Sequence, residues 1–288
     1  MTTPVPTTSK KLARKGKNSR RSQLAALSRF TDRDRQLLVL LAKHQVLTTH
    51  QIARALIPCP RAARHRLEVL EDVGLIDVFR PTLPAGSSPK HAVLTPLGAM
   101  AVASLVDEQH AASVKTDSAV RLAARPDLRH LLGINDFFCS LMAAAHESAG
   151  CELELWWSER ACTRTWGALV RPDGFGRWRE GSRSVDFFLE YDTGTEPQPT
   201  VLAKLDGYTA LQAATGRTSP VLFWLHSLKR ETELHRRLTT ANSKVPIATT
   251  TGDAATVDPS SPVWRIACSG GGGDRARLID LERLASAS

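Results

Sequence analysis

The chain has 288 residues, of which 42% are hydrophobic, and its 38 Lys and Arg residues outnumber 29 Asp and Glu residues, giving a formal net charge of +9. This hydrophobic content supports a buried core and excludes wholesale disorder. No apolar run approaches the roughly 18 residues of a membrane span, and the basic N-terminus lacks the apolar stretch of a secretory signal. Five scattered cysteines without a CxxC pair exclude a compact disulfide scaffold and a standard zinc knuckle. We therefore expect a reduced, cytoplasmic protein without a membrane partner.

The positive charge is concentrated in the first part of the chain. Residues 1–30 carry eight basic and no acidic side chains, residues 31–106 carry a net charge of +3, and the remaining residues carry −2. Residues 1–28 are rich in Pro, Thr, Ser and basic residues, which predicts a disordered basic tail. Such a tail is expected to hold nucleic acid in a salt-sensitive manner that does not depend on base sequence.

Residues 29–106 show the element order of a winged helix-turn-helix. Thr31 is the expected N-cap of the first helix, Thr48 or Thr49 caps the second, and Gly74 ends the third. The segment "LEVLEDVGLI", followed by a loop and "HAVLTPLG", resembles the winged-helix modules of many bacterial regulators. The expected helices cover 31–44, 50–57, 61–73 and 96–106, the expected strands 75–79 and 91–95, and the wing loop 80–90.

In such modules the third helix lies in the major groove of DNA. Here that helix carries Arg61, Arg64, His65 and Arg66, which are the predicted base contacts. The helix start at Thr48 or Thr49 and the wing residues Arg80 and Lys90 are predicted to contact phosphates. The alternative is a winged helix that contacts only protein.

Residues 107–127 are predicted to be a linker, and residues 128–285 an α/β domain. The expected helices are 128–148, 200–216 and 229–240. The expected strands are 151–157, a short one at 165–170, 185–192, 220–225 and 245–249, with edge pieces around 263–267; a turn is expected after Gly174. Of the adjacent Trp156 and Trp157, one is expected in the core because neighbouring strand residues face opposite ways, while an exposed one would stack on a nucleobase.

This order of elements resembles the PD-(D/E)xK nuclease-like fold. Pro172-Asp173 stands at the position of the family's "PD", and Glu190 follows on the next long strand. Two carboxylates on adjacent strands can converge on Mg²⁺, which activates water and stabilises the phosphorane charge. The candidate catalytic residues are Asp173, Glu190 and Lys204, and the candidate metal ligands are Glu159, Asp173 and Glu190.

The motif departs from that of an active nuclease. The residue two after Glu190 is Asp192, where an active nuclease carries Lys, so Lys204 on the following helix would have to reach the site. A Pro-Asp-Gly sequence is also a common turn. The interpretation that we favour is an inactive nuclease-like domain, with an active Mg²⁺-dependent enzyme as the alternative. His130 is expected to be a solvated or capping side chain.

The segments "HLLGINDFF", "WWSE", "RPDG", "FFLEYDTGTEP" and "KLDGY" together resemble the replication-relaxation family of actinobacterial plasmids and integrative elements, over about residues 30 to 240. The resemblance implies a DNA-associated role in plasmid replication or mobilisation. Its implied partners are double-stranded DNA and plasmid replication or relaxase proteins, and a homodimer is left open.

Three functions remain open on sequence alone. The first is a DNA-binding accessory protein in plasmid or mobile-element replication, relaxation or transfer. The second is a Mg²⁺-dependent endonuclease acting on plasmid DNA. The third is a winged-helix transcriptional regulator with a partner-binding α/β domain. A relaxase's closely spaced histidines and catalytic tyrosine are absent, which argues against the nicking transesterase itself.

Overall fold

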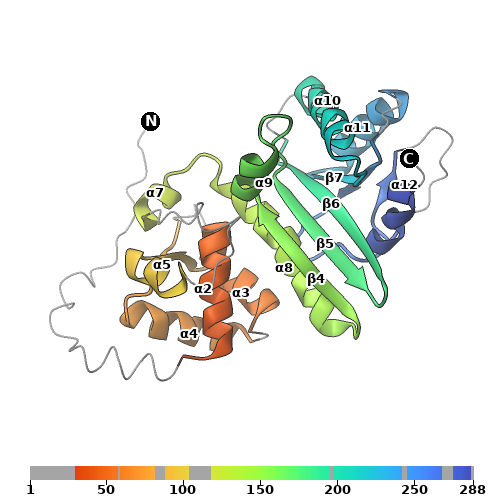
Figure 1. The fold of residues 1–288 in the computed structure, drawn as a ribbon. Coiled ribbons are helices and arrows are strands. Elements are labelled where there is room, and N and C mark those ends of the chain that lie inside the picture. The colour runs from red at the N-terminus through yellow and green to blue at the C-terminus, as the bar shows by residue number, and fades with distance from the viewer. Residues whose placement is uncertain are drawn as a thin grey trace. The chain divides into compact units, whose positions relative to one another are not determined.

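The computed structural model describes residues 30–57, 59–81, 88–103, 118–194, 198–241, 245–267 and 275–286. The predicted basic tail 1–28 and most of the predicted wing loop lie outside the described residues. The described residues form a mixed α/β structure with two sheets (Figure 1). The chain divides into two compact units, Met1–Leu128 and Arg129–Ser288.

In the first unit, helices surround a small antiparallel sheet of strand order β1-β3-β2. Leu37, Leu41, Ile52, Leu67 and Leu70 are almost fully buried and bring the helices onto one core. In chain order the elements are α2 (Asp32–His44), β1 (Val46–Thr48), α3 (Thr49–Ala55), α4 (Pro60–Asp72), β2 (Ile76–Phe79), β3 (His91–Leu94), α5 (Pro96–Val102) and α7 (Ala119–Ala123).

The predicted helix starts are confirmed by side-chain caps. The hydroxyl of Thr31 accepts a hydrogen bond from the backbone N–H of Asp34, whose carboxylate accepts from the N–H of Thr31, a reciprocal capping box. The second helix is capped by Thr48, with Gln51 as the reciprocal partner, so Thr49 is its first residue.

Two segments of the first unit differ from the prediction. The link before the second helix is strand β1, whose Val46 pairs with Val93 of β3. The predicted linker contains α7, which packs against β2 and whose Leu122 is buried, while residues 107–117 of this linker lie outside the described residues. In both segments a few apolar residues are recruited by distant partners, and so short a run shows no periodicity of its own.

The second unit is built on a six-stranded sheet of order β4-β5-β6-β7-β8-β9. The first three strands pair antiparallel, β6, β7 and β8 run parallel, and β9 pairs antiparallel with β8. The elements are α8 (Leu128–Glu147), β4 (Cys151–Ser158), α9 (Glu159–Trp166), β5 (Gly174–Glu180), β6 (Arg183–Asp192), α10 (Gln198–Thr215), β7 (Val221–Leu225), α11 (Leu228–Ala241), β8 (Ile247–Thr251), β9 (Arg265–Ile266), the 3₁₀ helix η3 (Leu278–Leu281) and α12 (Glu282–Ser286).

Helices cover both faces of this sheet. On one face, α8 places Phe137 and Phe138 against Trp156, Phe187 and Trp224. The opposite face is covered by α9, α10 and α11, which contribute Cys162, Tyr208, Leu211, Leu234 and Leu238 to a core with Phe175, Phe188 and Phe223. The prediction that one residue of the Trp156-Trp157 pair is buried is therefore confirmed for Trp156.

Two predictions in the second unit are wrong. Residues 165–170 are the end of α9 and a turn, not a strand, and the segment predicted as a turn after Gly174 is strand β5. Gly174 and Gly176 conceal the alternation of β5, yet both are required. A Cβ at Gly176 would lie 2.4 Å from Cζ of Phe187, so only glycine lets the strand pass under the aromatic core.

Candidate functional site

The two predicted carboxylates meet at one end of the large sheet. Gly174 of β5 pairs with Leu189 of β6, so Asp173 lies beside Glu190 on the neighbouring strand. Both are nearly buried, with 8% of Asp173 and 3% of Glu190 exposed. Strand pairing alone thus brings together acids that are far apart in the sequence.

Asp173 is held by two donors. Its Oδ1 lies 3.0 Å from Nε2 of His130, in the first turn of α8, and its Oδ2 accepts a hydrogen bond of 2.7 Å from the backbone N–H of Tyr191. Burial of the imidazole lowers the pKa of His130, because it disfavours the charged form. The hydrogen bond to Asp173 and the negative charges of Asp173 and Glu159 act in the opposite direction and outweigh burial, so the pKa of His130 is raised above its usual value. The expectation that His130 is a solvated or capping residue is wrong.

Glu190 has two donors on α10. The ammonium of Lys204 donates to Oε2 at 2.7 Å, and the hydroxyl of Tyr208 donates to Oε1 at 2.5 Å. Burial, and then the neighbouring charge of Asp173, raise the pKa of Glu190 to about 7 against the lowering effect of Lys204. Lys204 therefore reaches Glu190 from the following helix, as the sequence suggested for a displaced lysine.

Asp192, which stands where an active nuclease carries lysine, is paired with a different helix. Its Oδ2 accepts from Nε of Arg230 on α11 at 2.5 Å, and its Oδ1 accepts from the backbone N–H of Gly194 at 2.6 Å. Glu159 is exposed at the start of α9, directly after the Ser158 that pairs with Gly174.

In this arrangement the carboxylates do not form a ready metal site. Each of the four carboxylate oxygens of Asp173 and Glu190 already has a donor group of the chain beside it. Two of these donors belong to cationic or titratable side chains, namely Lys204 and His130. Over the part of the chain that the structure describes, no group of three or more His, Cys, Asp or Glu side chains is arranged to hold a metal ion. The assignment of Glu159, Asp173 and Glu190 as Mg²⁺ ligands stays a prediction.

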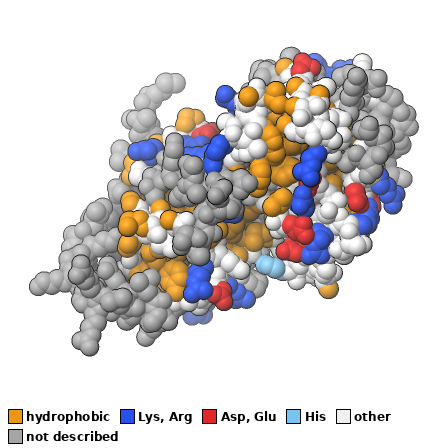
Figure 2. All heavy atoms as spheres, viewed as in Figure 1, with side chains coloured by type: hydrophobic (Ala, Val, Ile, Leu, Met, Phe, Trp, Pro, Cys, Tyr) orange, Lys and Arg blue, Asp and Glu red, His pale blue; other side chains and the backbone are white. Residues whose placement is uncertain are grey.

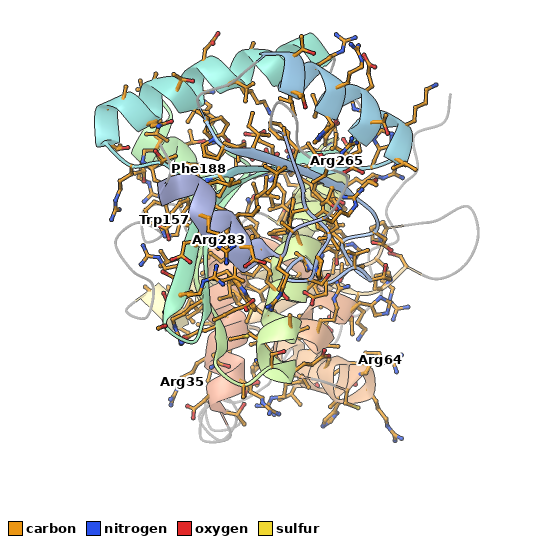
Figure 3. The ribbon with its side chains drawn as sticks, turned by 90° about the vertical axis from the view of Figure 1, so that its right-hand side faces the viewer. Arg35, Arg64, Trp157, Phe188, Arg265 and Arg283 are labelled. Atoms are coloured by element: carbon orange, nitrogen blue, oxygen red, sulfur yellow. The ribbon has the colours of Figure 1, made fainter. Side chains whose placement is uncertain are left out.

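In the first unit, α4 presents Arg61, Arg64 and His65 as exposed side chains, and Arg64 points away from the ribbon in Figure 3. Arg66 differs from its neighbours. Its Nε donates to Oδ1 of Asp34 at 2.5 Å, and a second guanidinium nitrogen pairs with the other oxygen of this fully buried carboxylate. The structure therefore assigns Arg66 to joining α4 and α2, in place of the predicted base contact.

The residues predicted to contact phosphates also divide. Thr49 is 3% exposed, and both its backbone N–H and its hydroxyl donate to the carbonyl oxygen of Lys90, so the side chain predicted to meet a phosphate is buried. Arg80 is exposed just after β2, and the ammonium of Lys90 lies 3.3 Å from Glu68 of α4. These two cations stay predicted phosphate contacts.

The fold and this site define a mixed α/β protein with a buried, protein-bonded carboxylate pair at the strand ends of its larger sheet. Residues 38–222 match the family described as Replication-relaxation. Since the match covers more than half of the 288 residues, the chain belongs to the replication-relaxation family. Membership supports, at this coarse level, a role in replication or relaxation.

Neither the curated proteins nor the solved structures contain a match to this chain. None of the helices in the described segments is both long and apolar enough to cross a membrane.

Proposed function

We propose that this protein binds double-stranded DNA through the exposed face of α4, as an accessory factor in the replication, relaxation or transfer of a plasmid or mobile element. The observation that carries the proposal is the division of α4 into two faces. Ala63, Leu67 and Leu70 are buried in the core, whereas Arg61, Arg64 and His65 face solvent. A helix anchored on one face and cationic on the other is suited to the major groove.

The surrounding elements support a winged helix-turn-helix. Helices α3 and α4 pack on each other. Arg80 directly follows β2 and Lys90 directly precedes β3, so both lie where the hairpin strands join the loop that would be the wing and would meet the phosphate backbone. The net charge of the first 106 residues has the same sign as this surface.

The test measures duplex binding by the full chain. A preferred site is first selected from a random duplex library, and the affinities of Arg61→Ala and Arg64→Ala are then compared with wild type by fluorescence anisotropy. Each substitution is expected to weaken binding by about 1–3 kcal/mol and to relax selectivity at one base position. Arg236→Ala, an exposed arginine on α11, is the matched control. Unchanged affinity and selectivity in both α4 variants would remove this proposal.

A second candidate function is phosphodiester cleavage by a nuclease-like second unit. The observation that favours it is the convergence of Asp173, Glu190 and Lys204. The elements α8, β4, β5, β6, α10 and β7 follow the order of the PD-(D/E)xK core, with α9 placed between β4 and β5. Supercoiled plasmid is incubated with Mg²⁺ and wild type, Asp173→Asn, Glu190→Gln or Lys204→Met. The control is Asp206→Asn, an exposed acid on α10. If wild type does not nick the plasmid with any metal or salt tested, this candidate function is wrong. It is also wrong if nicking persists in all three variants.

A further inference from the structure

The exposed side of α4 changes the sign of its charge partway along the helix. Steps of three or four residues join the exposed ionisable side chains on this side, which is the spacing of neighbours on a helix. They are Arg61, Arg64, His65, Glu68 and Asp72. The first three are basic and the last two are acidic, so cationic groups occupy the first two turns of α4 and carboxylates the remainder.

The acidic part of α4 does not suit contact with a phosphate backbone. Glu68 is 53% exposed, and its Oε1 lies 3.3 Å from the ammonium of Lys90, while Asp72 is exposed at the last residue of the helix. Carboxylates placed against phosphates are repelled, and such a juxtaposition of like charges is costly. The helix can therefore approach DNA with its first two turns, but not with its whole length.

The side chains of these first two turns are suited to one base. Unlike Arg66, which is bound to Asp34, the guanidinium groups of Arg61 and Arg64 form no ion pair with any residue that the structure describes, and Arg64 points away from the ribbon (Figure 3). A fork of two N–H donors matches the O6 and N7 acceptors that guanine presents in the major groove. The whole of α4 contains neither Asn nor Gln, the side chains that match the donor and acceptor of adenine.

We propose that α4 selects guanine in the major groove, with Arg61 and Arg64 as the two readers and the acidic part of the helix turned out of the groove. This inference rests on the proposed function of α4 and names the duplex that it prefers. The Cβ atoms of residues three apart on a helix are separated by about 5–6 Å, whereas base pairs are stacked about 3.4 Å apart. The two guanines therefore belong to adjacent or next-but-one base pairs, on either strand.

The test uses the full chain and the site that it selects from a random duplex library. The selected site is expected to contain two guanines within about three base pairs, at positions where Arg61→Ala or Arg64→Ala relaxes selectivity. Each of these guanines is then replaced by 7-deazaguanine, which still pairs with cytosine but lacks the N7 acceptor. Each replacement is expected to weaken wild-type binding about fivefold, whereas the same replacement at other guanines of the duplex leaves binding unchanged.

Lysine variants separate base reading from charge. Arg61→Lys and Arg64→Lys keep the positive charge but lose the guanidinium fork. Both are expected to bind an unrelated duplex within about twofold of wild type and to lose most of the discrimination in favour of the selected site. Arg33→Lys, at an exposed arginine on α2 of the same unit, is the matched control and is expected to keep this discrimination.

Removal of the acidic charges tests the orientation of the helix. Asp72→Asn is expected to raise the affinity for every duplex alike, most strongly at low salt, and to leave the selected sequence unchanged. A changed sequence in this variant would show that the end of α4 also reads bases, and would overturn the inference.

The inference and the proposed function fail in different ways. Guanine reading is overturned if the positions that depend on Arg61 and Arg64 hold no guanine, or if both lysine variants keep the full discrimination, and duplex binding by α4 then still stands. If Arg61→Ala and Arg64→Ala leave affinity and selectivity unchanged, the proposed function itself is removed, and guanine reading with it.

Discussion

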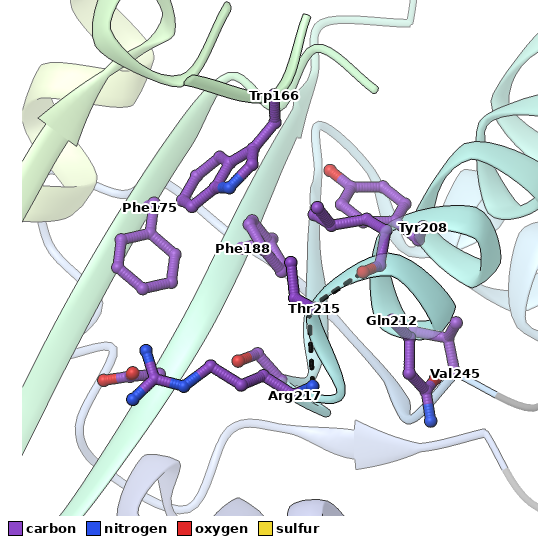
Figure 4. A pocket seen from close by; sticks show the side chains of 11 residues that line it. Trp166, Phe175, Phe188, Tyr208, Gln212, Thr215, Arg217 and Val245 are labelled. Atoms are coloured by element: carbon purple, nitrogen blue, oxygen red, sulfur yellow. Dashed lines mark hydrogen bonds between the residues drawn. The ribbon is translucent and has the colours of Figure 1, made fainter. Parts of the chain in front are cut away.

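The hydroxyl of Tyr208 donates a hydrogen bond of 2.5 Å to Oε1 of Glu190, while the ring of the same tyrosine packs against that of Phe188 with centroids 5.2 Å apart (Figure 4). One side chain thus links the carboxylate pair to the hydrophobic core between α10 and the sheet. Figure 2 shows hydrophobic side chains gathered between α9 and α10 on this unit. Because Tyr208 is 2% exposed, it cannot leave Glu190 without also changing the packing of this core. The protonation of Glu190 and the packing around Phe188 are therefore expected to influence each other.

The burial of Glu190 predicts a specific dependence of stability on pH. Its pKa is raised from 4.5 to about 7, so the folded state favours the protonated form. The stabilising contribution is complete below pH 4.5, where Glu190 is protonated in both states, and is lost as the pH rises through about 7. Relative to Glu190→Gln, which does not titrate, the wild-type free energy of unfolding is expected to fall across this window. Denaturant unfolding of both proteins at several pH values measures the difference, and a difference that stays constant or grows with pH would contradict the assignment.

The His130–Asp173 pair predicts a second titration. The pKa of His130 is raised, so its contribution to stability is complete below its ordinary value of 6.5 and is lost as the pH rises through the higher folded-state value. Asp173→Asn is expected to lower the pKa of His130, because it removes the charge and the acceptor that outweigh burial. The imidazole proton resonances of His130, followed by NMR from about pH 5 to 9, measure this change. An unaltered titration curve in Asp173→Asn would show that the contact does not set the protonation of His130.

The buried Asp34 is expected to be a stability residue of the first unit. Its carboxylate closes the capping box with Thr31 and pairs with Arg66, and these bonds lower its pKa although burial acts in the opposite direction. Asp34→Asn should reduce the free energy of unfolding by about 2 kcal/mol at neutral pH, because the guanidinium of Arg66 then faces a neutral amide instead of a carboxylate. The stability from a lowered carboxylate pKa is present above 3.8 and is lost as the pH falls through the folded-state value. The loss in Asp34→Asn should therefore shrink in acid.

The matched control for Asp34 lies in the same helix turn. Asp32 pairs with Arg35 at the surface, where both side chains are largely exposed, so Asp32→Asn should change stability by less than about 0.5 kcal/mol. Arg66→Ala is expected to reproduce the destabilisation and to leave base selectivity unchanged, which separates its role from those of Arg61 and Arg64. Equal effects of Asp32→Asn and Asp34→Asn would refute the distinction.

What the sequence predicts correctly is local or follows from strand pairing. The cap at Thr31 depends on residues within one turn, and the proximity of Asp173 and Glu190 follows from two strands that end at the same edge. Long-range partners are the part that sequence misses. No residue near His130 in the sequence indicates that its partner is Asp173, which lies further along the chain, after β4 and α9. Likewise, no residue near Arg66 indicates that it pairs with Asp34 instead of facing solvent. The sequence does not predict strand β5, because its glycines are required by the rings of Phe138 and Phe187, which come from other elements.

Gly133 gives the most direct test of how α8 positions the site. A Cβ at this residue would lie 2.2 Å from Cε1 of Tyr191, so only glycine allows the tyrosine ring against the helix. The backbone N–H of Tyr191 holds Asp173, and therefore Gly133→Ala should both destabilise the second unit by about 1–3 kcal/mol and disturb the His130–Asp173 contact. Denaturant unfolding measures the first effect and the NMR titration of His130 the second. Adding Tyr191→Leu should recover much of the lost stability, because it removes the ring that an added methyl group meets. A Gly133→Ala protein as stable as wild type, with an unaltered His130 titration, would mean that this close approach does not position Asp173.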